Sequence, residues 1–210
     1  MSLNNKEISL ILSELQLEGY YIQKITQPTH FSLVLHLYKQ KLIYLYISLL
    51  SGECRLHSVK NKMPKEEKMM RFVQLLRSRV IGAKIDKAFQ FQENRIVILR
   101  LLKGIEEYSL IIKLWSNASN ILLVDKDDII VDTFYRREGK GEIAKKKFNL
   151  PEKRDVKNSF VVRSYDKTLS FNEAIEKEYS ETSKQVSQTA LIEAANRFFN
   201  KKIERVEHLI

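Results

Sequence analysis

The segment from Tyr135 to Arg163 concentrates side chains that can bind an anion. It holds ten Lys or Arg and four Asp or Glu residues, and ten minus four leaves a local excess of six positive charges. Lysine and arginine neutralise phosphates, and the neighbouring rings of Tyr135 and Phe148 can stack on unpaired bases, so the segment predicts an RNA-binding loop. A solvated charged loop is the alternative. The basic residues of this cluster are Arg136, Arg137, Lys140, Lys145, Lys146 and Lys147.

No residue pattern typical of a catalytic or metal site accompanies this cluster. The four histidines are scattered and the single cysteine, Cys54, has no second cysteine at a ligand spacing. The acids between Asp125 and Asp132 lack the central glycine and terminal glutamate of a calcium loop, so they predict turns. Phosphate-binding glycine loops and nucleophile elbows are also missing from the sequence. We therefore expect a protein that is not an enzyme and that has no metal site and no cofactor.

The overall charge points in the same direction as the basic cluster. The 210 residues include 36 Lys and Arg against 26 Asp and Glu, a formal net charge of +10. This balance favours an anionic partner, with nucleic acid ahead of an anionic membrane, although solubility alone is another explanation.

The composition and the N-terminus also bear on the compartment. One cysteine favours a reducing compartment, and the N-terminus has no basic stretch followed by an apolar one. The longest apolar run, Leu42 to Leu50, is far short of the roughly 20 residues of a membrane helix. We expect a cytoplasmic protein without a membrane segment.

Two amphipathic helices must help to position the candidate residues. Apolar residues recur at helical spacing from Ile8 to Leu15, with Asn4 or Asn5 as the cap and Gly19 as the predicted stop. The second helix is predicted to begin at Pro64 and to end at Gly82. Its apolar face comprises Met69, Phe72, Val73, Leu76 and Val80.

Short runs rich in β-branched and aromatic residues predict eight or nine strands around these helices. The run 113–125, "KLWSNASNILLVD", fits a strand, a tight polar turn and a second strand. Together the elements predict an α+β domain, a two-layered and mostly antiparallel β-sandwich flanked by helices. The predicted strands cover residues 20–26, 30–39, 41–50, 53–59, 85–92, 95–102, 107–115, 120–125 and 129–133.

The last third of the chain has a different character. We predict a domain over residues 1–150, a linker over 151–169 and a helical segment over 170–210. In the helical segment, apolar residues follow a spacing of four and three that is typical of the start of a coiled coil. These seam residues are Ile192, Phe199, Ile203, Val206 and Ile210.

Several fragments in this order resemble the N-terminal domain of the NFACT family, whose members are also called fibronectin-binding protein A-like proteins. The resemblance spans Met1 to about Pro151. It is carried by "MSLNNKEISLILSEL" with "GYYIQKITQP", by "RLHSV", "MMRFVQLLRSRVIGAKI", "QENRIVIL" and "IIVDTFYR", and by the hairpin "KLWSNASNILLVD". The resemblance also implies a fold related to the N-terminal domain of formamidopyrimidine-DNA glycosylases. The Pro-Glu catalytic start of those enzymes is missing here, because Ser2 and Leu3 stand in its place.

The same resemblance implies further contacts to RNA. The family's Asp-Arg pair corresponds to Asn94 and Arg95, and its Gly-Arg-His hairpin tip corresponds to Ser116, Asn117 and Ala118. In the quality-control members of the family, both features lie where the domain meets transfer RNA. Here Arg95 could clamp a phosphate or stack on a base, and Asn117 could hydrogen-bond a base or a ribose. Trp115 could stack, with core packing as its alternative role.

These features together predict a non-catalytic module that binds RNA, within a ribosome-associated quality-control factor acting on stalled large subunits. The expected partners are transfer RNA and the large ribosomal subunit. One alternative is a surface adhesin that binds fibronectin or fibrinogen, an extracellular matrix partner that the family's older name suggests. The other is a protein-protein scaffold that self-associates through the coiled coil.

Overall fold

The computed structural model describes residues 1–63, 69–151 and 160–181. Its strands form one antiparallel sheet in the order β4-β3-β2-β1-β5-β6-β7-β8-β9. The α+β, mostly antiparallel fold predicted from the sequence is therefore confirmed. The strands are β1 (Tyr21–Thr26), β2 (Ser32–Tyr38), β3 (Leu42–Ser48), β4 (Arg55–Val59), β5 (Lys84–Gln90), β6 (Ile96–Lys103), β7 (Glu106–Lys113), β8 (Asn120–Asp125) and β9 (Ile130–Thr133).

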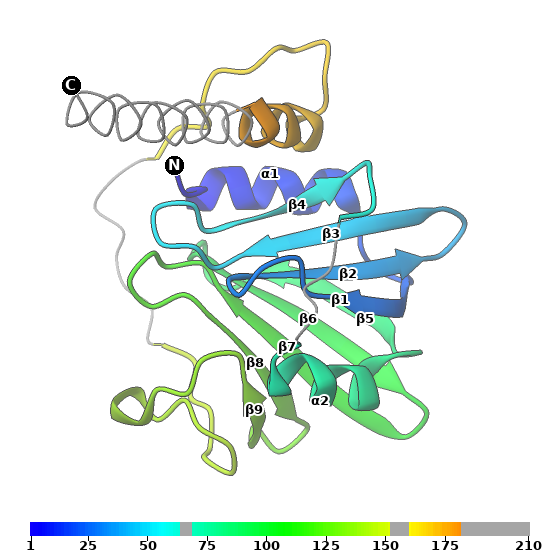
Figure 1. Ribbon diagram of the computed structural model, residues 1–210, viewed down its shortest axis with the longest axis vertical. Helices are drawn as coiled ribbons and strands as arrows, with labels where there is room; N and C mark the ends of the chain where they lie inside the picture. The colour runs from blue at the N-terminus through cyan, green and yellow to red at the C-terminus, as the bar shows by residue number, and fades with distance from the viewer. Residues whose placement is uncertain (64–68, 152–159, 182–210) are drawn as a thin grey trace, which may run out of the picture.

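The two layers of the sandwich are the two halves of this single sheet. They are joined where β1 pairs with β5, through the register Tyr21↔Lys84 and a hydrogen bond from Ile22 N–H to the Ala83 carbonyl at 2.9 Å. In Figure 1, strands β1 to β4 cross the upper part of the sheet and β6 to β8 cross its lower part. Alternating residues of both halves point inward and share one hydrophobic core, as period-two patterning requires. Members of this core include Leu33, Leu35 and Leu37 from β2 and Val97, Leu99 and Leu101 from β6.

Helix α1 (Asn5–Leu15) begins with a capping box. The Asn4 side chain accepts from the Glu7 N–H while the Glu7 carboxylate accepts from the Asn4 N–H, so two otherwise unpaired donors are satisfied. The helix ends earlier than predicted, at Leu15 rather than near Gly19. Gln16 adopts a left-handed conformation with φ 44°, and this turn brings Leu17 into the core.

Helix α2 (Arg71–Val80) packs an apolar face on the sheet, and the predicted core residues Phe72, Val73, Leu76 and Val80 are buried. Two arginines anchor it. Arg71 pairs with Asp132 of β9, and the Arg77 guanidinium donates to the Ile25 carbonyl at 2.6 and 2.9 Å. The predicted start at Pro64 lies outside the described residues, and the described helix begins at Arg71.

Both edges of the sheet are covered by other parts of the chain. At β4, Ser58 N–H donates to the Asn172 side chain and Lys60 N–H donates to the Glu176 carboxylate, so a helix over residues 171–181 occupies this edge. At β9, Ile130 N–H donates to the Lys146 carbonyl at 2.9 Å. Covered edges prevent a sheet from pairing with another chain.

The helix over residues 171–181 is integrated with the first part of the chain. Its side chains Phe171, Ile175 and Tyr179 belong to the main core, and the Glu14 carboxylate of α1 accepts from the backbone N–H of Phe171 at 2.8 Å. The predicted division at residues 150 and 170 stays a prediction. The coiled-coil positions lie outside the described residues, and within the described part no helix is long and apolar enough to cross a membrane.

Candidate nucleic-acid interface

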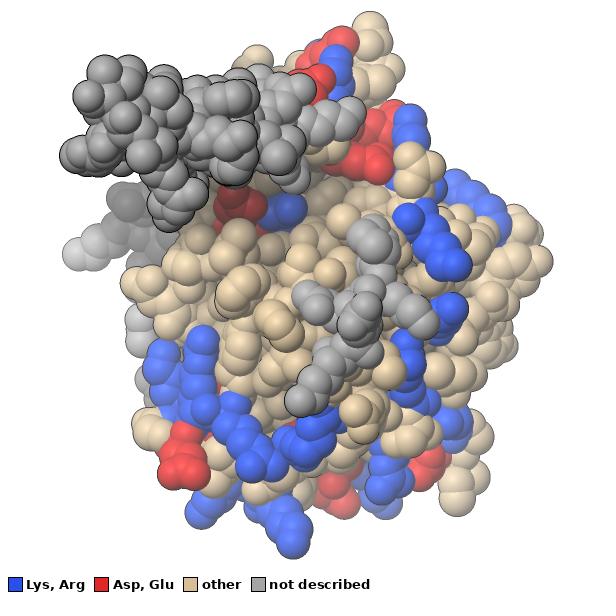
Figure 2. Space-filling model, in the orientation of Figure 1, with Lys and Arg blue, Asp and Glu red and all other residues tan. Residues whose placement is uncertain are grey.

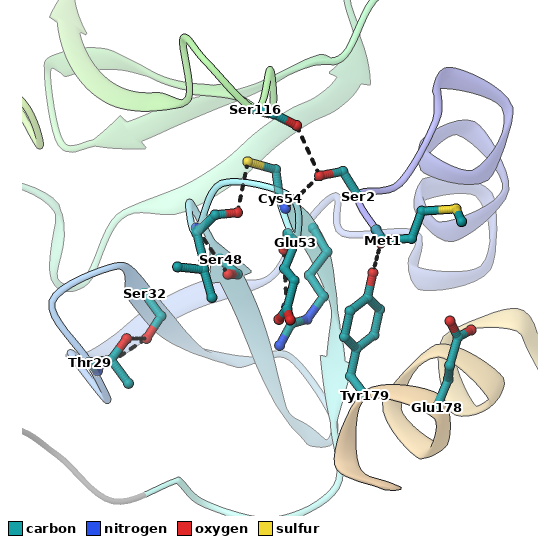
Figure 3. A network of polar contacts seen from close by, with 12 residues as sticks. Met1, Ser2, Thr29, Ser32, Ser48, Glu53, Cys54, Ser116, Glu178 and Tyr179 are labelled. Carbon is teal, nitrogen blue, oxygen red and sulfur yellow. Dashed lines mark hydrogen bonds and ion pairs between the residues drawn. The ribbon is translucent and has the colours of Figure 1, made fainter. Parts of the chain in front are cut away.

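Several loops meet at one end of the sheet, and polar contacts tie them together. The turns after β1, β3, β5 and β7 and the segment after β9 all lie at this end. Ser119 Oγ, at the β7–β8 tip, donates to the Leu49 carbonyl at 2.9 Å. Ser2 Oγ lies 3.2 Å from Ser116 Oγ and accepts from Cys54 N–H at 2.9 Å, as Figure 3 shows. The N-terminus therefore fastens the β7–β8 tip to the β3–β4 turn.

Asn94 and Trp115, which the sequence places 21 residues apart, are in direct contact. The Trp115 indole N–H donates to Asn94 Oδ1 at 2.9 Å, and the same oxygen accepts from the Arg95 N–H at 2.8 Å. The Trp115 ring is half-buried and packs against the apolar cluster on the outer side of β6 to β8. Trp115 therefore packs against the sheet and holds the Asn94 side chain. Asn117, two residues further along, is exposed at the tip.

Arg95 lies beside these two residues but directs its guanidinium inward. Burial is the main cause that lowers its pKa below the ordinary arginine value, partly offset by the neighbouring Cys54, Glu7 and Tyr179. Its Nε and Nη2 atoms are buried and have no hydrogen-bond partner. A role for Arg95 in contacting RNA stays a prediction, and in this conformation its donors face other parts of the protein.

A buried ion pair supports the tip and the start of the basic segment. Lys113 at the end of β7 pairs with Glu142, and both residues are buried. The other carboxylate oxygen of Glu142 accepts from Asn120 Nδ2 at 2.7 Å, and Asn120 Nδ2 also donates to the Tyr135 carbonyl. Charges are retained at buried positions when they are paired and hydrogen-bonded, so this network fixes residues 135–142 against β7 and β8.

The basic cluster lies on the surface above this buried network. Arg136, Lys140 and the three lysines from Lys145 to Lys147 are exposed, whereas Arg137 is half-buried with its Cζ 5.7 Å from the Tyr135 ring. In Figure 2, blue side chains gather at the lower left, where Figure 1 places the segment after β9, and they border a largely uncharged central area.

The lysines are held along the edge of the sheet. The Lys145 N–H donates to the Ile130 carbonyl at 2.8 Å, and Lys147 forms an isolated bridge with Ile129. Because their backbone is fixed, these lysines present a row of charge at a defined place on the surface.

The structure thus brings the predicted residues to one end and edge of the molecule, in different environments. Asn94, Arg95 and Trp115 belong to the packed base of the tip, and Asn117 is its exposed point. The lysines and Arg136 are exposed beside it. By contrast, the arginines of α2 contact other parts of the fold. Arg71 pairs with Asp132, Arg77 donates to the Ile25 carbonyl, and Arg79 pairs with Glu106.

One surface feature at this end was missed by the sequence analysis. Phe31 in the β1–β2 turn is 47% exposed and Leu50 after β3 is 38% exposed. An aromatic residue in a hairpin turn, where polar residues are usual, is the sequence signal for this feature. The strand predicted over residues 30–39 includes the turn, whereas β2 begins at Ser32.

Among the described residues, no group of three or more His, Cys, Asp or Glu side chains is arranged to hold a metal ion.

Comparisons with known proteins agree on the fold. Residues 7–208 match the family model described as NFACT N-terminal and middle domains. No curated protein sequence matches the chain. Similar solved structures include the N-terminal part of the fibronectin/fibrinogen-binding protein of Streptococcus suis, with a TM-score of 0.67 and 23% identity over 73% of this chain and 62% of that one.

Two further structures have comparable similarity. The fibrinogen-binding protein of Staphylococcus aureus gives a TM-score of 0.65 and 19% identity, over 73% of this chain and 58% of that chain. The N-terminal domain of fibronectin-binding protein PavA of Streptococcus pneumoniae gives 0.65 and 21% identity, over 89% and 82%. The chain spans less than two thirds of the first two of these structures. At these identities the likeness shows a shared fold.

Proposed function

This chain belongs to the NFACT family, and from that premise we propose that it binds RNA without catalysing a reaction. In this proposal the chain is a module of a cytoplasmic, ribosome-associated quality-control factor, and its partners are transfer RNA and the large ribosomal subunit. The proposal combines the net charge of +10 with the resemblance to the family members that act on stalled large subunits.

The observation that carries the proposal is the row of exposed cations beside the tip. Lys145, Lys146 and Lys147 are exposed and their backbone is fixed along β9. A fixed row of cations can contact successive phosphates at a lower entropic cost than a mobile loop. The buried Lys113–Glu142 pair holds the neighbouring residues 135–142, which supports a fixed backbone beside the proposed site.

Binding of labelled transfer RNA as a function of salt concentration tests the proposal. We expect the wild type to bind with a steep salt dependence, because each neutralised phosphate releases counterions. Changing Lys145, Lys146 and Lys147 together to Ala should reduce the slope of log K against log salt by up to roughly 2–3.

A variant with the same loss of charge elsewhere serves as the matched control. Lys41, Lys84 and Lys87 are also exposed, but they lie on β5 and in the β2–β3 turn, away from the basic cluster. Changing these three to Ala should leave most of the slope intact. Equal losses in both triple variants would show that only net charge matters. If the wild type binds transfer RNA no tighter than an unrelated basic protein at physiological salt, the proposal fails.

Binding of a matrix protein is the second candidate. The observation that favours it is the likeness to structures named as fibronectin- or fibrinogen-binding proteins. Measuring the binding of this chain to immobilised fibronectin and fibrinogen tests the activity, and protease treatment of intact cells tests whether the protein is displayed. Saturable binding together with surface cleavage would favour this candidate over a cytoplasmic role in RNA binding.

A further inference from the structure

Phe31 is an aromatic side chain held in an exposed position by a hydrogen-bonded turn. The Phe31 N–H donates to Thr29 Oγ1 at 3.2 Å, and Thr29 Oγ1 lies 2.7 Å from Ser32 Oγ. Ser32 Oγ in turn accepts from the Thr29 N–H at 3.1 Å. Figure 3 shows Thr29 and Ser32 in contact across this turn. These hydrogen bonds fix the backbone of the turn, so a ligand that packs against the ring does not have to order the turn as well.

Two further hydrogen bonds join the turn to the segments that follow β3 and β9. The Phe31 carbonyl accepts from the Leu49 N–H at 2.7 Å, which brings the exposed Leu50 to the same place. The Tyr135 hydroxyl donates to the His30 carbonyl at 3.5 Å. The exposed ring of Phe31 and the turn that carries it, which we call the Phe31 patch, therefore lie next to the beginning of the basic segment.

The charges around the Phe31 patch favour an anionic ligand. Arg136 directly follows Tyr135 and is exposed, and Arg137 lies close to the Tyr135 ring. The acidic residue of the β3–β4 turn, Glu53, forms an ion pair with Arg55 at 3.1 Å. An exposed ring near an exposed cation is the combination with which proteins bind unpaired nucleotides, because the ring stacks on a base and the cation binds its phosphate.

We infer that the Phe31 patch binds an unpaired nucleotide, with the base stacked on Phe31 and the phosphate contacted by Arg136. This inference deepens the proposed function and rests on it, because it names the kind of RNA structure that the same end of the molecule selects. Bases inside a duplex are stacked on each other and offer no free face to a protruding ring. The patch therefore favours loops, bulges and single strands over duplex RNA.

The test compares a short single-stranded RNA of mixed sequence with a blunt RNA duplex that carries the same number of phosphates. The wild type should bind the single strand more tightly than the duplex. Phe31→Ala should weaken binding of the single strand roughly 5- to 150-fold and leave duplex binding nearly unchanged. Phe31→Trp should retain the preference, because it keeps a stacking surface. Tyr21, which is 48% exposed at the opposite end of β1, provides the matched control, and Tyr21→Ala should have no effect.

The outcomes separate this inference from the proposed function. If the wild type binds neither RNA at physiological salt, both fail. If it binds both RNAs equally and Phe31→Ala changes neither affinity, RNA binding stands and the stacking site is refuted. A loss of fibronectin binding in Phe31→Ala, without a change in RNA binding, would make the patch a protein-docking surface and would also refute the inference.

Discussion

The buried Lys113–Glu142 pair should be a large and strongly coupled contributor to stability. The Lys113 and Glu142 side chains are only 9% and 4% exposed. Removal of one partner leaves the other charge buried without compensation, which typically costs about 3–5 kcal/mol. We therefore expect Lys113→Met and Glu142→Leu each to lower the free energy of unfolding by about that amount. In a domain of this size the melting temperature should fall by roughly 6–20 °C.

The double variant distinguishes a paired charge from two independent contributions. When both charges are removed, neither position 113 nor position 142 holds an unpaired buried charge. Asn120 keeps its hydrogen bond to the Tyr135 carbonyl. Replacing a whole buried pair with apolar residues of similar volume is often close to neutral, so we expect the double variant to lose less stability than either single variant.

Urea unfolding followed by circular dichroism measures these differences. Trp115 provides a second, local probe, since it is the only tryptophan and lies 5.0 Å from Lys113 Nζ. The exposed pair Lys60–Glu173 is the control, because its side chains are 67% and 38% exposed and Lys60→Met should change stability very little. If the effects of Lys113→Met and Glu142→Leu simply add in the double variant, the reasoning about an uncompensated buried charge is wrong.

Three further predictions concern other buried polar groups. Burial, with a smaller contribution from Arg55, lowers the pKa of His57 from 6.5 to about 3. The unfolded state therefore binds a proton first, and stability should fall as the pH drops from about 6.5 towards 3; urea midpoints should show this dependence in His30→Gln and lose much of it in His57→Gln. Glu7→Gln removes the charge that holds Arg163, so amide hydrogen exchange in residues 171–181 should become faster, and an unchanged exchange rate would count against this clamp. Asn172→Ala leaves the Ser58 N–H of the edge strand unpaired and should cost about 1–3 kcal/mol in thermal or urea unfolding, with no cost if water replaces the amide.

The strands and helices were predictable because each is specified locally. The alternation of apolar residues in β2 and β6 matches the inward-facing core positions, and Asn4 caps α1 as expected. Helix ends were harder to predict, because Gln16 ends α1 in a left-handed conformation that is usual for glycine. Non-local pairing was not predictable either, since the joining of β1 to β5 depends on residues more than 60 positions apart, Tyr21 and Lys84.

The candidate site was predictable in its composition and only partly in its geometry. The sequence identified the exposed lysines correctly as a basic segment, because charge is visible in a list of residues. The direction of a side chain depends on what surrounds it, and the surroundings of Arg95 come from α1, from the β3–β4 turn and from residue 179. The contact between Asn94 and Trp115 likewise joins segments 21 residues apart. The turn that exposes Phe31 is instead held locally, by the side chains of Thr29 and Ser32.

The architecture and the proposed binding therefore depend on different residues at this end of the molecule. The Lys113–Glu142 pair is buried and the Asn94–Trp115 contact is partly buried, and both hold the loops together. Phe31, Asn117 and the exposed lysines contribute little to the core. Substitutions in the first group should lower stability, and they should weaken binding only through the loss of folded protein. Substitutions in the second group should change binding at constant stability, because truncation of an exposed side chain leaves no cavity and no unpaired buried group.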